Sequence, residues 1–334
     1  GPVSGYPAPE LGPEDYNNYE FAPSRIILWV ANQQHLYFGS FVLAVPIFCM
    51  LIEFIGIRVR EEDPVMAEKY DRLAKDLMKV SLTAYSWTAI LGGILLFTFI
   101  TLFPGFFKYM AGIFRPVMHV YALMFLAESG VLYVYYYGWD KMKDDTFLKW
   151  IHCSLSVLLN LIGTVLMYLA NSWATFMQAP GGIDSEGRFL GNIWHVIHST
   201  LWNPVGVHRI LGNIVFGGGI VGAYAAYHYL TAKNEEERAH YDWVCYVAMF
   251  ICIFGLIPLP FAGYWLMKEV YAFRQQMGIT LMGGIMAWLF IIQAVMIGLL
   301  FFAANSYLHN GMARVKGSHR YMKYCKYMVL LLIC

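Results

Sequence analysis

Charge is scarce in this sequence. Of its 334 residues only 13% are charged, whereas 59% are hydrophobic, and long runs carry few or no ionisable groups. The chain also lacks a glycine-rich phosphate loop, a Ser-His-Asp order in a loop context and a DNA-binding motif. A soluble globular fold needs more polar surface than this composition supplies. These absences exclude a soluble enzyme and a nucleic-acid-binding protein, and the net charge of +1 selects no partner.

Cysteine is also sparse, and it occurs without a motif. The six cysteines form no C-x-x-C pair and no C-x-x-C-H site for attaching a c-type haem. Most of them lie inside or at the ends of apolar runs, where a free thiol acts as a small core residue. We therefore predict neither disulfides nor metal ligands at Cys49, Cys153, Cys245, Cys252, Cys325 and Cys334.

The chain does contain a series of apolar runs that are long enough to cross a bilayer. We predict an all-α, polytopic transmembrane bundle of about eight spans, the last of which begins near Tyr324. The first 34 residues are expected to form an extracytoplasmic arm and an interfacial helix, and residues 35–334 a single transmembrane helical domain. The first seven spans are expected at residues 36–58, 80–103, 112–137, 149–170, 206–231, 243–266 and 279–304.

Lysine and arginine are concentrated in the loops that follow the odd-numbered spans. By the positive-inside rule these loops face the cytoplasm, so the N-terminus is predicted to lie outside. The loop after the first span also mixes both charge signs at helical spacing, and Asp63-Pro64 is a typical helix start. The basic residues of the first two such loops are Arg58, Arg60, Lys69, Arg72, Lys75, Lys79, Lys141, Lys143 and Lys149.

Four potential metal ligands stand near the starts of odd-numbered apolar runs. They are His35, His119, His208 and Met277. Odd-numbered spans of an up-and-down bundle begin on the same face, so all four are predicted to lie toward the outer side. Imidazole and thioether groups in apolar surroundings are the ligands that haem irons use. The pattern predicts transmembrane electron transfer by a haem-binding domain.

Two carboxylates are candidates for catalytic proton transfer. Glu128 lies well inside the third span with no basic neighbour in sequence, and such a group costs several kcal/mol unless it is protonated, paired or hydrated. The alternative is a helix-to-helix hydrogen bond made by the neutral acid. Glu53 lies near the inner end of the first span, where the alternative is an interfacial acid paired with Arg58 or Arg60.

Two arginines accompany the candidate ligands of the later spans. Arg209 follows His208 and could pair with a haem propionate, and Arg274 precedes Met277. The glycines of the fifth span permit close approach of a flat macrocycle or, alternatively, of a neighbouring helix. His195 and His198 could form a two-histidine metal clip or make ordinary polar contacts in the long outer loop.

Together these residues resemble subunit I of the cytochrome bd quinol oxidases. In that family a histidine on the first span is followed by a glutamate at the far end of the same helix, as His35 is by Glu53. An intramembrane glutamate on the third span precedes an aromatic run and Gly-Trp-Asp, as Glu128 precedes Gly138-Trp139-Asp140. The motifs Ala170-Asn171-Ser172-Trp173, Met177-Gln178-Ala179-Pro180 and Asn203-Pro204 followed by His208 are also similar.

The resemblance implies a haem-containing membrane oxidoreductase of a respiratory chain, in the bacterial inner membrane. His35 would ligate a high-spin haem, and His208 with Met277 a low-spin haem b, so two or more haems are expected and haem d is compatible with the pattern. Quinol would be the electron donor, and a second membrane subunit the partner.

Two departures from the family pattern leave other functions open. Val120 stands where the family has a second acid, with His119 beside it, and the family's large quinol-binding loop is absent between Trp265 and the seventh span. The first alternative is therefore a bd-like electron-transfer subunit of a larger complex, which exchanges electrons with a periplasmic cytochrome and does not reduce oxygen. A cofactor-free transporter or structural subunit is the second, although we see no paired, broken spans.

Overall fold

The computed structural model describes residues 22–284, 286–316 and 318, and the regular elements in these ranges are helices, with an isolated β-bridge between Ile183 and Phe189 in the long loop after α4. The all-α prediction is confirmed. The helices are α1 (Ser24–Val59), α2 (Pro64–Leu102), α3 (Pro104–Met142), α4 (Thr146–Gln178), α5 (Ile193–Ile197), α6 (Trp202–Thr231), α7 (Glu235–Leu256), α8 (Leu259–Phe273), α9 (Gln275–Met282) and α10 (Ala287–Gly311).

Seven of the helical segments in the described ranges are long and apolar enough to cross a membrane, which confirms the polytopic architecture. The eighth expected span, near Tyr324, lies outside the described residues. The residues expected to form an interfacial helix are the first turns of α1. The seventh span begins at Ala287 and not at residue 279, because α9 is a separate short helix before it.

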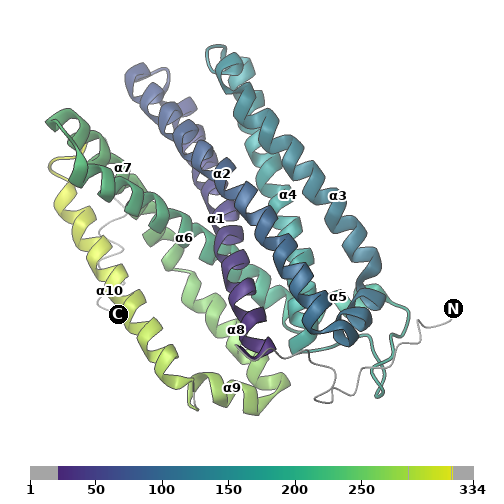
Figure 1. The fold of residues 1–334 in the computed structure, drawn as a ribbon. Helices are drawn as coiled ribbons and strands as arrows, with labels where there is room; N and C mark the ends of the chain where they lie inside the picture. The colour runs from purple at the N-terminus through teal and green to yellow at the C-terminus, as the bar shows by residue number, and fades with distance from the viewer. Residues whose placement is uncertain (1–21, 285, 317, 319–334) are drawn as a thin grey trace. The chain divides into compact units, whose positions relative to one another are not determined.

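The contacts divide the chain into two compact units, Gly1–Gly206 and Val207–Cys334. In the first unit α1 packs along α2, α2 on α3, α3 on α4, and α4 back on α1, so these four helices form a closed bundle (Figure 1). Short connections at residues 60–63, 103 and 143–145 make consecutive helices antiparallel.

Aspartate side chains begin two of the four bundle helices. Asp63 accepts a hydrogen bond from the Met66 backbone N–H at 3.0 Å, and Pro64 follows it as the first residue of α2, as the sequence predicted. Asp145 caps α4 in the same way, with 2.8 Å to the Leu148 N–H. These two caps define the end of the bundle at which α1 joins α2 and α3 joins α4, called the connection end below.

The opposite end of the bundle is covered by the long loop between α4 and α6. Tyr109 on α3 donates a hydrogen bond to the Gly187 carbonyl at 2.7 Å, which ties this loop to the bundle. Gly182 has φ +71°, and a Cβ there would lie 2.9 Å from Val196, so only glycine fits this turn. The core under the loop consists of Tyr109, Met110, Ile113, Phe114, Val117, Phe176, Val196 and Ile197.

In the second unit α6 packs against α7 through glycine. A Cβ on Gly218 would lie 2.8 Å from the Cβ of Cys252. A polar contact joins α10 to α7, because the Tyr307 hydroxyl donates a hydrogen bond to the Asp242 carboxylate at 2.5 Å. Arg314, beyond α10, contacts the same carboxylate at 2.7 Å, and this pairing raises the pKa of Arg314. The absence of a Cβ at Gly218 therefore allows α6 and α7 to pack closely.

The close approach at Gly218 predicts a sensitive position. Gly218→Val should destabilise the second unit, because overpacking a tight contact costs about 1–3 kcal/mol. Gly219→Val is the matched control, since a Cβ at Gly219 meets nothing within 4 Å. Thermal unfolding of the two variants in detergent measures the effect, and equal unfolding temperatures would contradict the packing described here.

Candidate functional site

His35 lies half-buried on α1 with its ring against the backbone of α2. Its Nδ1 is 3.2 Å from the carbonyl oxygen of Thr88, and a Cβ on Gly92 would lie only 3.0 Å from its Cε1. Because a carbonyl only accepts hydrogen bonds, Nδ1 carries the hydrogen in this contact. Glycine at position 92 leaves the space that the imidazole ring needs.

This arrangement fits a haem ligand. Histidines that bind metals usually donate their other ring N–H to a carbonyl or a carboxylate, which fixes the tautomer and the ring orientation. With Nδ1 directed at Thr88, a neutral His35 ring has its lone pair on Nε2, the form that ligates iron. The contact with Thr88 is compatible with the tautomer that a haem ligand needs, and the role of His35 as a ligand stays a prediction.

The other two candidates of the first unit differ in burial. His119 is exposed on α3, whereas Glu128 on the same helix is buried, with 7% of its surface exposed. Its Oε1 faces α4 and α1, because a Cβ on Gly163 would lie 3.0 Å from it and 3.0 Å from the Leu43 side chain. Glu128 is therefore a carboxyl group inside the bundle, as its sequence position suggested.

In the second unit His208 is half-buried on α6 and faces α8. A Cβ on Gly263 of α8 would lie 3.6 Å from its Nε2, so glycine again stands opposite a candidate histidine. Met277 lies on α9, partly exposed, and Arg274 precedes that helix with its guanidinium 5.9 Å from the Phe273 ring. Arg209 is half-buried beside His208. The pairing of His208 with Met277 stays a prediction.

One histidine of the long loop between α4 and α6 makes ordinary polar and aromatic contacts. His198 donates from Nδ1 to the Trp194 carbonyl at 2.9 Å, and its ring packs edge-on against Trp202 at 4.5 Å between centroids. In the described part of the chain, no three His, Cys, Asp or Glu side chains are grouped so that they could hold a metal ion.

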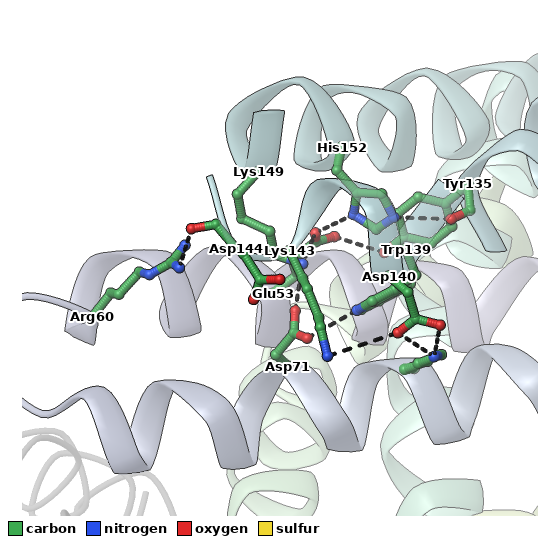
Figure 2. A network of polar contacts seen from close by, with 11 residues as sticks. Glu53, Arg60, Asp71, Tyr135, Trp139, Asp140, Lys143, Asp144, Lys149 and His152 are labelled. Carbon is green, nitrogen blue, oxygen red and sulfur yellow. Dashed lines mark hydrogen bonds and ion pairs between the residues drawn. The ribbon is translucent and has the colours of Figure 1, made fainter. Parts of the chain in front are cut away.

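A buried polar network at the connection end joins all four bundle helices (Figure 2). Glu53 of α1 is fully buried, and its Oε1 lies 2.7 Å from Lys149 Nζ and 2.5 Å from His152 Nδ1, both on α4. Tyr135 of α3 donates its hydroxyl to Oε2 at 2.7 Å. Lys149 also forms an ion pair with Asp71 of α2. We call Glu53, Asp71, Tyr135, Trp139, Lys149 and His152 the Glu53 network.

Aromatic rings enclose the network on the α3 side. The His152 ring lies 4.4 Å from the Tyr135 ring and 4.4 Å from the Trp139 ring, measured between centroids. Trp139 donates its Nε1–H to Asp71 at 2.9 Å, and Lys149 Nζ lies 4.6 Å from the centre of its ring. Every charge of the network therefore lies within ion-pair distance of an opposite charge, as buried ions require.

The pairing of Glu53 corrects one interpretation of the sequence. We considered that Glu53 pairs with Arg58 or Arg60, and this is wrong. Arg60 donates to the Asp144 carbonyl at 2.8 Å, and the Arg58 guanidinium lies 5.8 Å from the Phe54 ring. Sequence reasoning missed the true partners because it placed Lys149 among the cations of a loop. The spacing of Lys149 and His152, three residues apart at the start of an apolar span, was a signal that could have identified them.

The comparisons with known proteins agree with this architecture. Residues 24–287 match the family model of cytochrome bd terminal oxidase subunit I. The chain belongs to that family. The matched range contains the Glu53 network and all the candidate ligands, from His35 to Met277. Membership of this family means that the chain is a membrane protein related to respiratory oxidases.

A solved structure shows the same fold. The structure of bd oxidase from Geobacillus thermodenitrificans is similar with a TM-score of 0.66 at 15% identity, over 75% of this chain and 56% of that chain. This member of the subunit I family thus spans little more than half the length of that relative. No curated protein matches the sequence.

The Glu53 network predicts a large effect of removing its ammonium group. Lys149→Met should destabilise the bundle by about 3–5 kcal/mol, because it leaves the carboxylates of Glu53 and Asp71 without the cation between them. Lys75→Met is the matched control, since Lys75 pairs with Asp140 at 2.7 Å on the exposed surface and such pairs contribute little. Denaturant unfolding in detergent compares them, and a similar loss in both variants would refute the assignment.

Proposed function

We propose that this chain is a haem-bearing subunit of a respiratory oxidoreductase in a bacterial inner membrane, which passes electrons from quinol to b-type haems near the outer face. The observation that carries the proposal is the contact between His35 Nδ1 and the Thr88 carbonyl oxygen, in a chain that belongs to the bd subunit I family. When bound, haem supplies a one-electron carrier, and the haem types would be b and, by family likeness, d.

Each candidate side chain has a distinct role in this proposal. His35 would ligate a high-spin haem through Nε2, and His208 a low-spin haem b, with Met277 as the opposite ligand. Arg209 and Arg274 would pair with propionates, because a guanidinium matches a carboxylate in geometry and charge. His119, exposed on α3, would ligate a haem or form a hydrogen bond with one at the bundle surface.

Glu128 would hold and release a proton near these haems. Its carboxyl group lies between α3, α4 and α1 in apolar surroundings. A carboxyl group in such a place is stable when it is neutral or when a nearby positive charge compensates it. A change of charge on a nearby cofactor would therefore shift its protonation. The basic loops would face the cytoplasm, and a second membrane subunit would complete the complex.

A second function is favoured by the connection between α8 and α10. Only the eight-residue helix α9 and a few flanking residues separate Phe273 from Ala287, so the described residues hold no long quinol-binding loop there. The alternative is a bd-like electron-transfer subunit that exchanges electrons with a periplasmic cytochrome and does not reduce oxygen.

The haem assignments predict separate spectral losses. His208→Ala should remove the low-spin haem b signal, and His35→Ala the high-spin signal, because each removes an iron ligand. Reduced-minus-oxidised spectra with haem extraction measure both. His309→Ala, an exposed histidine in the last turn of α10, is the control and should keep both signals. Unchanged spectra in the first two variants would reject the assignment.

The two functions differ in their response to oxygen. A quinol oxidase consumes oxygen with quinol as donor, and cyanide or nitric oxide inhibits that uptake. The alternative predicts no such uptake by the complete complex but rapid electron exchange with an added periplasmic cytochrome. Oxygen-electrode and stopped-flow measurements on the same preparation decide between them.

A further inference from the structure

Four packed rings form a continuous row from the surface of the long loop to the start of α6. Measured between centroids, the Trp194 ring of α5 lies 5.6 Å from the His198 ring, which lies 4.5 Å from the ring of Trp202, the first residue of α6. The Trp202 ring in turn lies 5.2 Å from that of Tyr168 on α4. These separations are those of packed aromatic pairs. We call Trp194, His198, Trp202 and Tyr168 the aromatic row.

Hydrogen bonds to the backbone hold the two middle rings of the aromatic row. His198 Nδ1 donates to the Trp194 carbonyl at 2.9 Å, because a carbonyl only accepts. Trp202 Nε1 donates to the Tyr168 carbonyl at 2.8 Å. Each of these rings is therefore tied to the backbone of its neighbour in the row, which fixes the spacing of the rings.

One end of the aromatic row is exposed, and the other lies against α6. Trp194 is 63% exposed. The Tyr168 ring fills the space beside Gly206 of α6, where a Cβ would clash with it. His208, the predicted ligand of a low-spin haem, follows on the same helix and lies about 9 Å along the axis from Trp202. The row thus leads from the loop surface to the helix that carries this histidine.

The exposed end of the row carries no acidic side chain and no lysine or arginine. Residues 189–203 contain no Asp, Glu, Lys or Arg. The charged side chains just before them are engaged with one another, because Glu186 pairs with Arg188 at 2.5 Å and Asp184 accepts hydrogen bonds from the backbone N–H groups of both. Leu190, which precedes α5, is 57% exposed. This surface complements a partner whose contact face is likewise apolar and uncharged.

We propose that the aromatic row is an electron entry path from a water-soluble one-electron carrier protein that docks at Trp194. By the distribution of basic loops, the loop end of the bundle is expected to lie outside. Encounters between redox proteins bury little surface, so an exposed tryptophan and its neighbours form a contact of suitable size. The inference rests on the second proposed function, the exchange of electrons with a periplasmic cytochrome.

One electron crosses the aromatic row in each encounter. The carrier is oxidised and the ferric haem that His208 would hold is reduced. No covalent bond forms or breaks, no proton is transferred, and the rings are not oxidised, since they only bridge the gap through which the electron tunnels. Anchoring of Trp194 in lipid headgroups would require no contacts between the rings, so the continuity of the row favours a carrier protein over the membrane.

Docking is tested on the chain in detergent by a measurement that needs no bound haem. With fluorotryptophan incorporated, the fluorine NMR signal that disappears in Trp194→Phe belongs to Trp194. An oxidised soluble c-type cytochrome, whose iron is paramagnetic, should broaden this signal and leave that of Trp150, exposed at the connection end, unchanged. A Trp194 signal that does not respond refutes the proposal, and its broadening by a spin-labelled lipid would then identify a membrane anchor.

Electron entry is tested on the complete purified complex with full haem content. In stopped-flow reduction by the reduced cytochrome, Trp194→Ala should weaken the apparent affinity about 30-fold, the scale of a tryptophan at the centre of an interface. Trp150→Ala is the matched control and should behave as the wild type. An unchanged affinity in Trp194→Ala would overturn the docking site.

The variant His198→Leu tests the path separately from the docking surface. It interrupts the row between Trp194 and Trp202, so electron transfer within the bound complex should slow by an order of magnitude while the affinity stays unchanged. His198→Phe restores a ring at this position and should recover the rate. Equal rates in the two variants would overturn the path.

Failure of this inference and failure of the proposed functions give different results. If quinol reduces the haems of the wild type but the cytochrome does not, the aromatic row is no entry path and the first proposed function stands. If the Trp194 signal responds to the cytochrome but the wild type binds no haem, the docking site stands, whereas the electron path and both proposed functions fail.

Discussion

The bundle of α1 to α4 depends on the neutralisation of one buried carboxylate. Glu53 is fully buried in a largely apolar helix, and an uncompensated charge there would cost several kcal/mol. Its partners come from α3 and α4, and Lys149 extends the contact to Asp71 on α2. Each helix therefore has one correct rotation about its axis, because any other rotation would leave a buried ion unpaired.

A second constraint, close packing of helices, explains why small residues occur where the candidate ligands lie. In an apolar medium helices gain little from burying hydrophobic surface against each other, so close packing and polar contacts decide how they associate. Gly92 leaves room for the ring of His35, and Gly263 stands opposite His208. Buried charge determines how the helices meet at the connection end of the bundle, and glycine leaves space beside each of these two histidines.

Much of the fold could be predicted from the sequence, but less of the site. The apolar runs gave the spans, and Asp63-Pro64 gave the start of α2, because both signals are local. The Glu53 network could not be predicted in the same way, since the face of α4 that carries Lys149 and His152 is chosen by its contacts with three other helices. Residues 279–282 were assigned to the seventh span because they are apolar and continuous with it in sequence, whereas in the structure they belong to the short helix α9, which ends before Gly283.

The most direct test of the account is a cryo-electron microscopy map of the complete complex. The account predicts haem density on the outer side of the bundle, with iron at bonding distance from Nε2 of His35, while Nδ1 keeps its hydrogen bond to the Thr88 carbonyl. A second haem should be bonded to His208. A well-resolved map in which no haem contacts His35, or in which the His35 ring is reversed, would contradict the central claim.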